Sequence, residues 1–208
     1  MTRKKKPFRR TSGVRDAKLI VIASEGEVTE RLYFDGLASS AEYSASNVHV
    51  EVLRRENRNS DPKALLISLS EFKRKYTLKF DDELWVVCDV DRWGNKKLAE
   101  VNRLCKQKGF FVAVSNPCFE IWLLLHFITA DSFNNSSKEK LERGCNNVIL
   151  ELKKVLGSYS KTNIEMGKYL NRVEFAIDQA KTLDQGQDWP TSLGTRIYAL
   201  TESIIDLP

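Results

Sequence analysis

The regular alternation of short apolar runs with amphipathic segments is the feature that most limits how this 208-residue chain can fold. Residues 18–24 (KLIVIAS), 83–89 (ELWVVCD) and 110–115 (FFVAVS) are apolar and rich in β-branched or aromatic side chains, which predicts buried strands. Residues 47–55 alternate apolar and polar side chains and predict one more strand. Each strand is followed by a helical pattern, so we expect an α/β fold with a four-stranded parallel sheet flanked by helices.

The helical segments divide the chain into three parts. A helix is expected from about Glu30, and others over residues 61–76, 95–109 and 116–127. After residue 129 only helical patterns remain, over residues 137–157, 163–183 and 194–206. We therefore expect a basic, flexible tail over residues 1–17, an α/β domain over 18–128, and a helical extension over 129–208 that packs on it.

Composition excludes several classes of protein. The longest apolar run, residues 121–128, is too short to cross a membrane, and no signal-peptide pattern follows the basic start, so we expect a cytoplasmic protein. The four cysteines form no C-x-x-C pair and the chain has only two histidines, which argues against a structural zinc site. A disulfide framework is not expected either, and buried thiols are the preferred interpretation.

The positive charge is concentrated at the start of the chain. The net charge is +5, and six of the 33 Lys and Arg residues lie in the first ten positions, which hold no acidic residue. Such a segment can hold phosphate backbones without sequence preference, or can simply be a disordered, solubilising end. The candidate nucleic-acid contacts here are Arg3, Lys4, Lys5, Lys6, Arg9 and Arg10.

Two carboxylates follow the strand at residues 83–89. Asp89 and Asp91 are two positions apart, so both would point to the same side at the carboxyl end of that strand. Close carboxylates repel, and Mg²⁺, or Mn²⁺ in its place, would relieve that repulsion while keeping several waters. Glu25, beside Gly26, repeats the arrangement at the end of the first strand. If the two strands are neighbours, these three carboxylates converge.

Further acidic residues lie at the same predicted edge of the sheet. Glu120 falls in the first turn of the helix after the last strand, where it is a candidate ligand for the same or a second metal. A carboxylate favoured by a helix N-terminus is the alternative. Glu27 and Glu30 lie within a turn of Glu25 and are either ligands or solvated residues at a helix start.

These motifs resemble a known family. An apolar strand ending in E-G and another ending in D-x-D is similar to the Toprim domain of topoisomerases, primases and OLD-type nucleases. The longer resemblance is to RloB-like proteins, and it spans residues 18–200. It rests on five segments: EGEVTERLYF, WVVCDVD, SNPCFEIWLLLHF, YSK and WPTSLGTRIYAL.

The resemblance implies a Toprim-like fold, Mg²⁺-dependent phosphodiester chemistry and a role in bacterial or archaeal phage defence beside an ATPase encoded nearby. Glu25 would be the general acid/base or a metal ligand, and Asp89 and Asp91 the metal aspartates. Glu30 and Glu120 match positions for a second metal, although Glu25 and Glu30 are five residues apart where OLD-type sequences usually have four.

We therefore predict a nuclease that cleaves DNA or RNA with a metal-activated water. Lys161 would contact the transition-state phosphate with help from Arg92, unless both are solvated surface bases. Two alternatives stay open: a nucleotidyl or glycosyl transferase using D-x-D to hold a metal-bound diphosphate, and a non-catalytic module that binds nucleic acid or a partner. The helical third would dock that partner or a second copy of the chain. A P-loop NTPase is disfavoured because no G-x-x-x-x-G-K-[ST] motif occurs.

Overall fold

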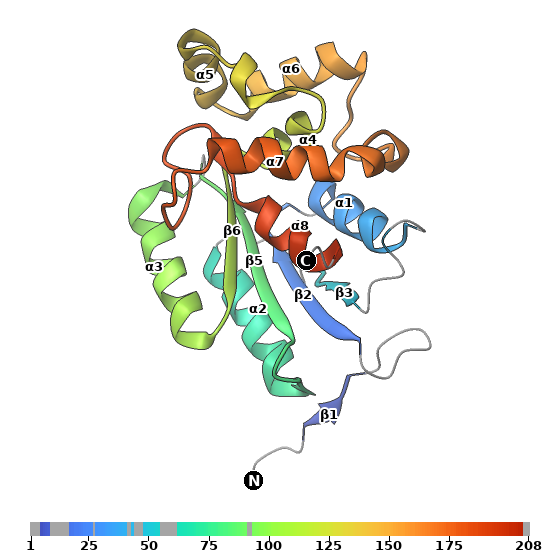
Figure 1. Ribbon diagram of the computed structural model, residues 1–208. Coiled ribbons are helices and arrows are strands. Elements are labelled where there is room, and N and C mark those ends of the chain that lie inside the picture. Colours follow the sequence, from blue (N-terminus) through green and yellow to red (C-terminus); the bar gives the residue numbers. More distant parts are fainter. Residues whose placement is uncertain are drawn as a thin grey trace.

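A computed structural model describes residues 5–8, 17–26, 28–40, 43, 48–54, 62–90 and 93–205 of the chain. Its centre is a sheet whose strands lie in the order β3-β2-β5-β6-β7 (Figure 1). The strands of this sheet are β2 (Lys18–Ser24), β3 (Val48–Val52), β5 (Glu83–Asp89), β6 (Phe111–Asn116) and β7 (Gly194–Thr195).

The prediction of an α/β fold is confirmed, but the sheet is mixed rather than purely parallel. β3, β2, β5 and β6 are the four predicted strands and run parallel. A fifth strand, β7, pairs antiparallel with β6 through Ser115 and Asn116. The prediction of a four-stranded parallel sheet is wrong in this respect, because a strand of two residues carries no hydrophobic alternation that a sequence pattern could reveal.

Helices cover both faces of the sheet, as the continuous apolar strands predicted. Successive side chains of β2 point to opposite faces. Ile20 and Ile22 join a core with α1 (Thr29–Ala38), α4 (Glu120–Leu125) and α8 (Ile197–Ile205). Leu19 and Val21 join a second core with α2 (Pro62–Lys75) and α3 (Gly94–Lys108). Burial on both faces therefore explains why this strand shows no polar alternation.

The region after residue 129 is helical but more divided than the sequence predicted. The expected helix over residues 137–157 is two helices, α5 (Asn135–Glu142) and α6 (Cys145–Leu156). They are separated at Gly144, whose φ of 144° is not a helical value. The expected helix over residues 163–183 contains two 3₁₀ turns before α7 (Val173–Leu183) begins. Buried residues of α6, α7 and α8 belong to the same core as those of α1 and α4.

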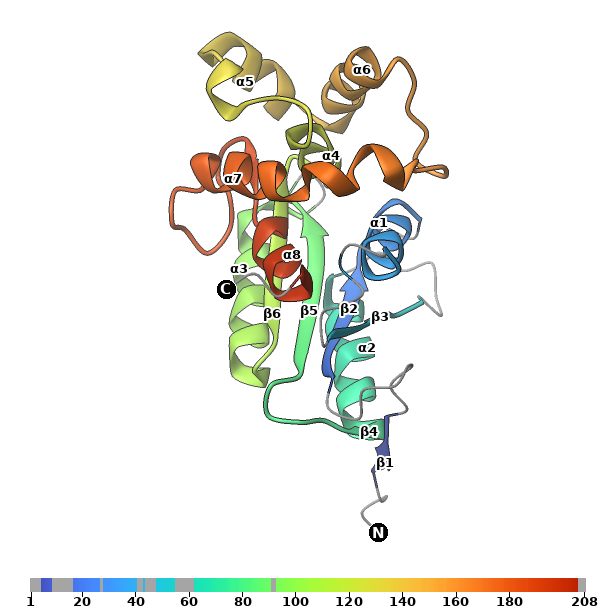
Figure 2. The same cartoon turned by 45° about the vertical axis from the view of Figure 1, so that its right-hand side comes forward.

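The basic start of the chain is held, in its described part, at one end of the sheet. β1 (Lys6–Pro7) pairs in parallel with β4 (Tyr76–Thr77), which follows α2 directly. Phe8 then packs against the rings of Phe72, Tyr76 and His49. Figures 1 and 2 show β1 at the end of the molecule opposite α5 and α6. Lys5 and Lys6 are therefore placed far from the carboxyl ends of β2 and β5.

No helix in the described part of the chain combines the length and the apolar character needed to cross a membrane.

We expect Phe8→Ala to lower the free energy of unfolding by about 1–2 kcal/mol, less than the roughly 3–5 kcal/mol of a core phenylalanine, because Phe8 is only half-buried. Phe80 is a matched control, since its side chain is fully exposed. Phe80→Ala should change the stability by less than about 0.5 kcal/mol. Urea unfolding of both variants tests this, and equal effects would mean that Phe8 does not anchor the tail.

Candidate active site

The carboxyl ends of β2 and β5 lie side by side, which is the condition under which the carboxylates that follow them can come together. Ser24 is opposite Val87 in the parallel register, and the backbone N–H of Glu25 continues the ladder by donating to the carbonyl of Val87 over 2.9 Å. The backbone N–H of Asp89 in turn donates to Oε2 of Glu25 over 3.3 Å. The sheet itself therefore brings together Glu25 and Asp89, which are 64 residues apart in the sequence.

Glu25 is a buried carboxylate held in one orientation. Its side chain is 2% exposed, and Oε2 accepts a 2.6 Å hydrogen bond from the indole Nε1 of Trp93. Sequence reasoning missed Trp93. The only signal was a tryptophan just after the D-x-D aspartates, and nothing in the sequence indicated that its N–H would turn back to the neighbouring strand.

Gly26 makes room for the carboxylate of Glu30. The backbone N–H of Gly26 donates to Oε1 of Glu30 over 2.9 Å. A Cβ atom at position 26 would lie 1.7 Å from Oε2 of the same carboxylate, well inside contact distance. The small residue is therefore needed because the Glu30 side chain lies directly over its backbone. Any larger residue would displace this carboxylate.

Glu120 and Lys161 form an ion pair at the same edge. Glu120 begins α4 and is 2% exposed, and its Oε1 lies 2.7 Å from Nζ of Lys161. The Tyr159 hydroxyl donates to the same oxygen over 3.3 Å. Thr29 holds the loop in place by donating its hydroxyl proton to the carbonyl of Lys161. The lysine side chain itself remains about half exposed.

These side chains surround one cavity. Its volume is about 280 Å³, and five predicted site residues line it together with five others. The predicted ones are Glu25, Glu30, Asp89, Glu120 and Lys161, and the others are Gly26, Val28, Thr29, Phe119 and Thr162. The structure thus places at one point carboxylates from the ends of β2 and β5 and from the starts of α1 and α4. Asp91, Arg92 and Glu27 lie outside the described residues.

Of the other predicted nucleic-acid contacts, the two that the structure describes do not line this cavity. Arg3, Lys4, Arg9 and Arg10 lie outside the described residues. Lys5 and Lys6 are described, and the pairing of β1 with β4 places them at the opposite end of the sheet.

The cavity carries an excess of buried negative charge. Burial, reinforced by the charges of Glu120 and Glu25, raises the pKa of Glu30 from 4.5 to about 7. A bound cation would remove this repulsion, and carboxylate oxygens are the ligands that hard cations such as Mg²⁺ and Mn²⁺ prefer. The oxygens of Glu25, Glu30, Asp89 and Glu120 are therefore of the chemical type that such an ion binds.

The carboxylates around the cavity do not form a compact set of ligands for one ion. Among the described residues, the only group of three potential ligand atoms that lie within 4.8 Å of one another is that of Cys118, Glu120 and Cys145. The carboxylates around the cavity are therefore spaced more widely. That spacing suits Mg²⁺, which usually keeps several waters and binds proteins through one or two carboxylates.

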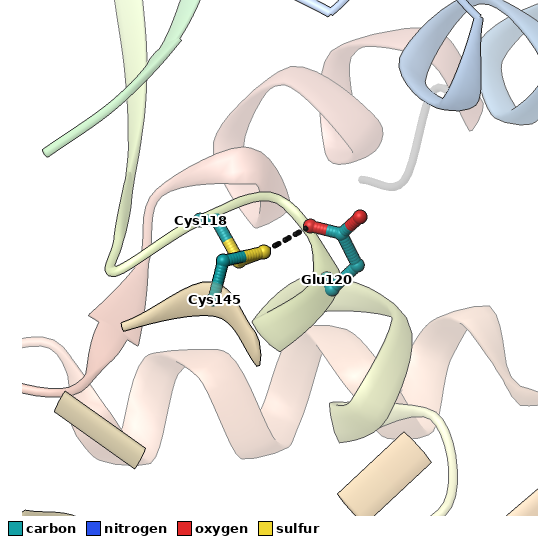
Figure 3. A group of neighbouring side chains, drawn as sticks. All are labelled: Cys118, Glu120 and Cys145. Carbon is teal, nitrogen blue, oxygen red and sulfur yellow. Dashed lines mark hydrogen bonds between the residues drawn. A yellow bond between two sulfur atoms is a disulfide. The ribbon is translucent and has the colours of Figure 1, made fainter. Parts of the chain in front are cut away.

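A disulfide borders the site, and the expectation of four buried thiols is wrong in part. Cys88 and Cys105 are buried and free, but Cys118 is bonded to Cys145. Figure 3 shows this pair beside Glu120, with Sγ of Cys145 3.1 Å from Oε2 of the carboxylate. A free Cys145 thiol would donate a hydrogen bond across this distance, whereas the bonded sulfur has no proton to give. The 27-residue separation gives no local pattern, so only the packing of α6 against α4 brings the two cysteines together.

The family of the chain follows from a comparison with family models. The model described as RloB-like protein matches residues 20–204, which is most of the chain. The protein belongs to the RloB-like family. This confirms the family inferred from the sequence motifs, and the match includes every described residue of the cavity. Searches of the curated proteins and of the solved structures give no match.

In the metal-free protein, we expect stability to fall as the pH rises from about 4.5 to about 7. The folded pKa of Glu30 lies above its ordinary value, so the folded state binds the proton more tightly than the unfolded state. Above pH 7, where Glu30 is ionised in both the folded and the unfolded state, the free energy of unfolding is lower by on the order of 3 kcal/mol. Glu30→Gln should flatten this decline in urea unfolding with EDTA present. The exposed Asp131→Asn variant should keep it, and an unchanged decline in Glu30→Gln would contradict the assignment.

Reduction of the disulfide should destabilise the fold. The bond closes a loop of 27 residues, for which chain entropy gives roughly 3.5 kcal/mol. We expect a phosphine reductant to lower the free energy of unfolding of the natural chain by about that amount. Cys145→Ser should not respond to the reductant, and a natural chain that is equally unresponsive would show that the bond does not form in solution.

Proposed function

We propose that this RloB-like protein is a metal-dependent nuclease that hydrolyses phosphodiester bonds of DNA or RNA. The observation that carries the proposal is the cavity in which buried Glu25, Glu30 and Glu120 meet Asp89 and Lys161. A fold gains nothing from three buried acidic side chains around one cavity, because each is costly to desolvate. Their burial is accounted for if the cavity binds a cation together with a substrate phosphate.

The chain's own residues have separate roles in this proposal. Glu25, Asp89, Glu30 and Glu120 would hold one or two Mg²⁺ or Mn²⁺ ions, with Asp91 completing the D-x-D motif. A bound ion would supply charge neutralisation at the phosphate and a water of lowered pKa. Alternatively, Glu25 would accept a proton instead of binding the ion, and the Trp93 N–H would hold its carboxylate in place for that role.

Lys161 is suited to contact the substrate. It neutralises the buried Glu120 but is about half exposed, so its ammonium group is within reach of an entering phosphate. A phosphate oxygen could share that ammonium with Glu120, placing one positive charge beside the negative charge of the transition state. Lys161 is therefore proposed as a catalytic residue, with Tyr159 and Thr29 as the groups that position Glu120 and the lysine loop.

The resemblance noted above also supports a role in phage defence, with an ATPase encoded nearby as partner.

The test is cleavage of plasmid DNA, single-stranded DNA and total tRNA by the purified protein, with Mg²⁺, Mn²⁺ or EDTA. We expect metal-dependent cleavage that Asp89→Asn lowers by about 100-fold or more. Asp131→Asn, which removes an exposed carboxylate away from the cavity, should retain activity.

The absence of cleavage with any metal, also after addition of the neighbouring ATPase, would contradict the nuclease assignment. It would favour the alternative of a binding module. Loss of activity in both aspartate variants would instead point to a general effect of charge.

A further inference from the structure

A cluster of exposed bases lies at the end of the molecule opposite the carboxylate cavity. We call it the basic surface, and all of its members are exposed: Lys5, Lys6, Lys73, Arg74, Lys75, Lys79 and Lys108. They come from β1 and the residue before it, from the last turns of α2 and α3, and from the segment after β4.

Contacts between these segments make the surface continuous. Lys6 is paired with Tyr76, the residue directly after Lys75. Nζ of Lys73 donates to the carbonyl of Lys108 over 2.8 Å, which joins the ends of α2 and α3. Arg74 and Lys108 line the same hollow between those two helices. The bases therefore form one patch and not separate surface charges.

Four bases of this patch have no acidic partner in the described part of the protein. Lys6, Arg74, Lys75 and Lys108 form no ion pair with any described residue. Lysines elsewhere are commonly paired, and examples are Lys18 with Glu83, Lys63 with Glu100, Lys106 with Asp188 and Lys181 with Glu202.

Helix dipoles explain only part of the cluster. Bases in the last turn of a helix are favoured by its negative end, which accounts for Lys73, Arg74, Lys75 and Lys108. It does not account for Lys5, Lys6 and Lys79, which lie outside the helices. Phe80, fully exposed beside Lys79, adds an aromatic face on which a base could stack. Exposed bases with an exposed aromatic ring fit a nucleic acid better than an acidic protein.

We propose that the basic surface binds the phosphate backbone of a polynucleotide at a place distinct from the carboxylate cavity. The two places are separated by at least the length of β5, whose seven residues span about 20 Å. That length corresponds to about six base pairs of duplex. The basic surface would thus be a second binding place for a long substrate. The proposed ligand is therefore a polymer and not a mononucleotide. This deepens the proposed function, but the binding itself does not depend on cleavage.

The experiment measures binding without cleavage. Asp89→Asn protein in EDTA is titrated into a fluorescent DNA duplex of about 40 base pairs, over about 50–200 mM salt. Lys6→Glu/Lys75→Glu is then compared with Lys140→Glu/Lys153→Glu, which changes the net charge equally at exposed lysines of α5 and α6. Thermal unfolding checks that both variants are folded. Polyglutamate serves as a competitor without bases or phosphates.

We expect the first variant to bind at least about tenfold more weakly, with the slope of log K against log salt reduced by about 2. The control variant should lose much less affinity, and polyglutamate should compete poorly. Equal losses in the two variants, or equal competition by polyglutamate, would overturn the proposal. Because no cleavage is measured, a failure of the nuclease assignment would not produce either result.

Discussion

The parallel pairing of β2 with β5 is the contact on which the candidate site depends. It sets Ser24 beside Val87, so the residues that follow each strand emerge at one point although they are far apart in the sequence. The pairing is fixed by burial, because both strands face an apolar core on each side and a shift in register would disrupt the close packing of both cores. The position of Glu25 relative to Asp89 is therefore a consequence of core packing.

Around that point three carboxylates are buried, although the desolvation of a charged group is unfavourable. Glu25, Glu30 and Glu120 are all almost fully buried, and each is met by a specific group. Trp93 donates to Glu25, the backbone of Gly26 donates to Glu30, and Lys161 pairs with Glu120. These contacts offset the cost of burial only in part: burial, with smaller contributions from the charges of Glu120 and Glu25, still raises the pKa of Glu30. A site with residual negative charge attracts a cation, and this is why we interpret the cavity as a metal site.

The two ends of the sheet have opposite electrostatic character. Carboxylates lie where the parallel strands end, and a cluster of exposed bases lies near where they begin. In the interpretation that we favour, a polynucleotide is held at the basic end and reaches the cavity at the acidic end. The separation avoids neutralisation of the acidic cluster by the protein's own bases, with Lys161 as the cation that the cavity itself contains.

The sequence alone determined the α/β class, the four parallel strands and five of the residues that line the cavity, because these depend on periodicity and on which residues follow a strand. It also determined the family, since the motifs on which the resemblance rests are local. It did not reveal Trp93 as the partner of Glu25, the bond between Cys118 and Cys145, or the short strand β7, because each requires a contact between distant segments. The tertiary structure also decided where the basic tail lies. Its charge was evident from composition, but only the packing of Phe8 and the pairing of β1 with β4 place Lys5 and Lys6 at the end of the sheet away from the carboxylates.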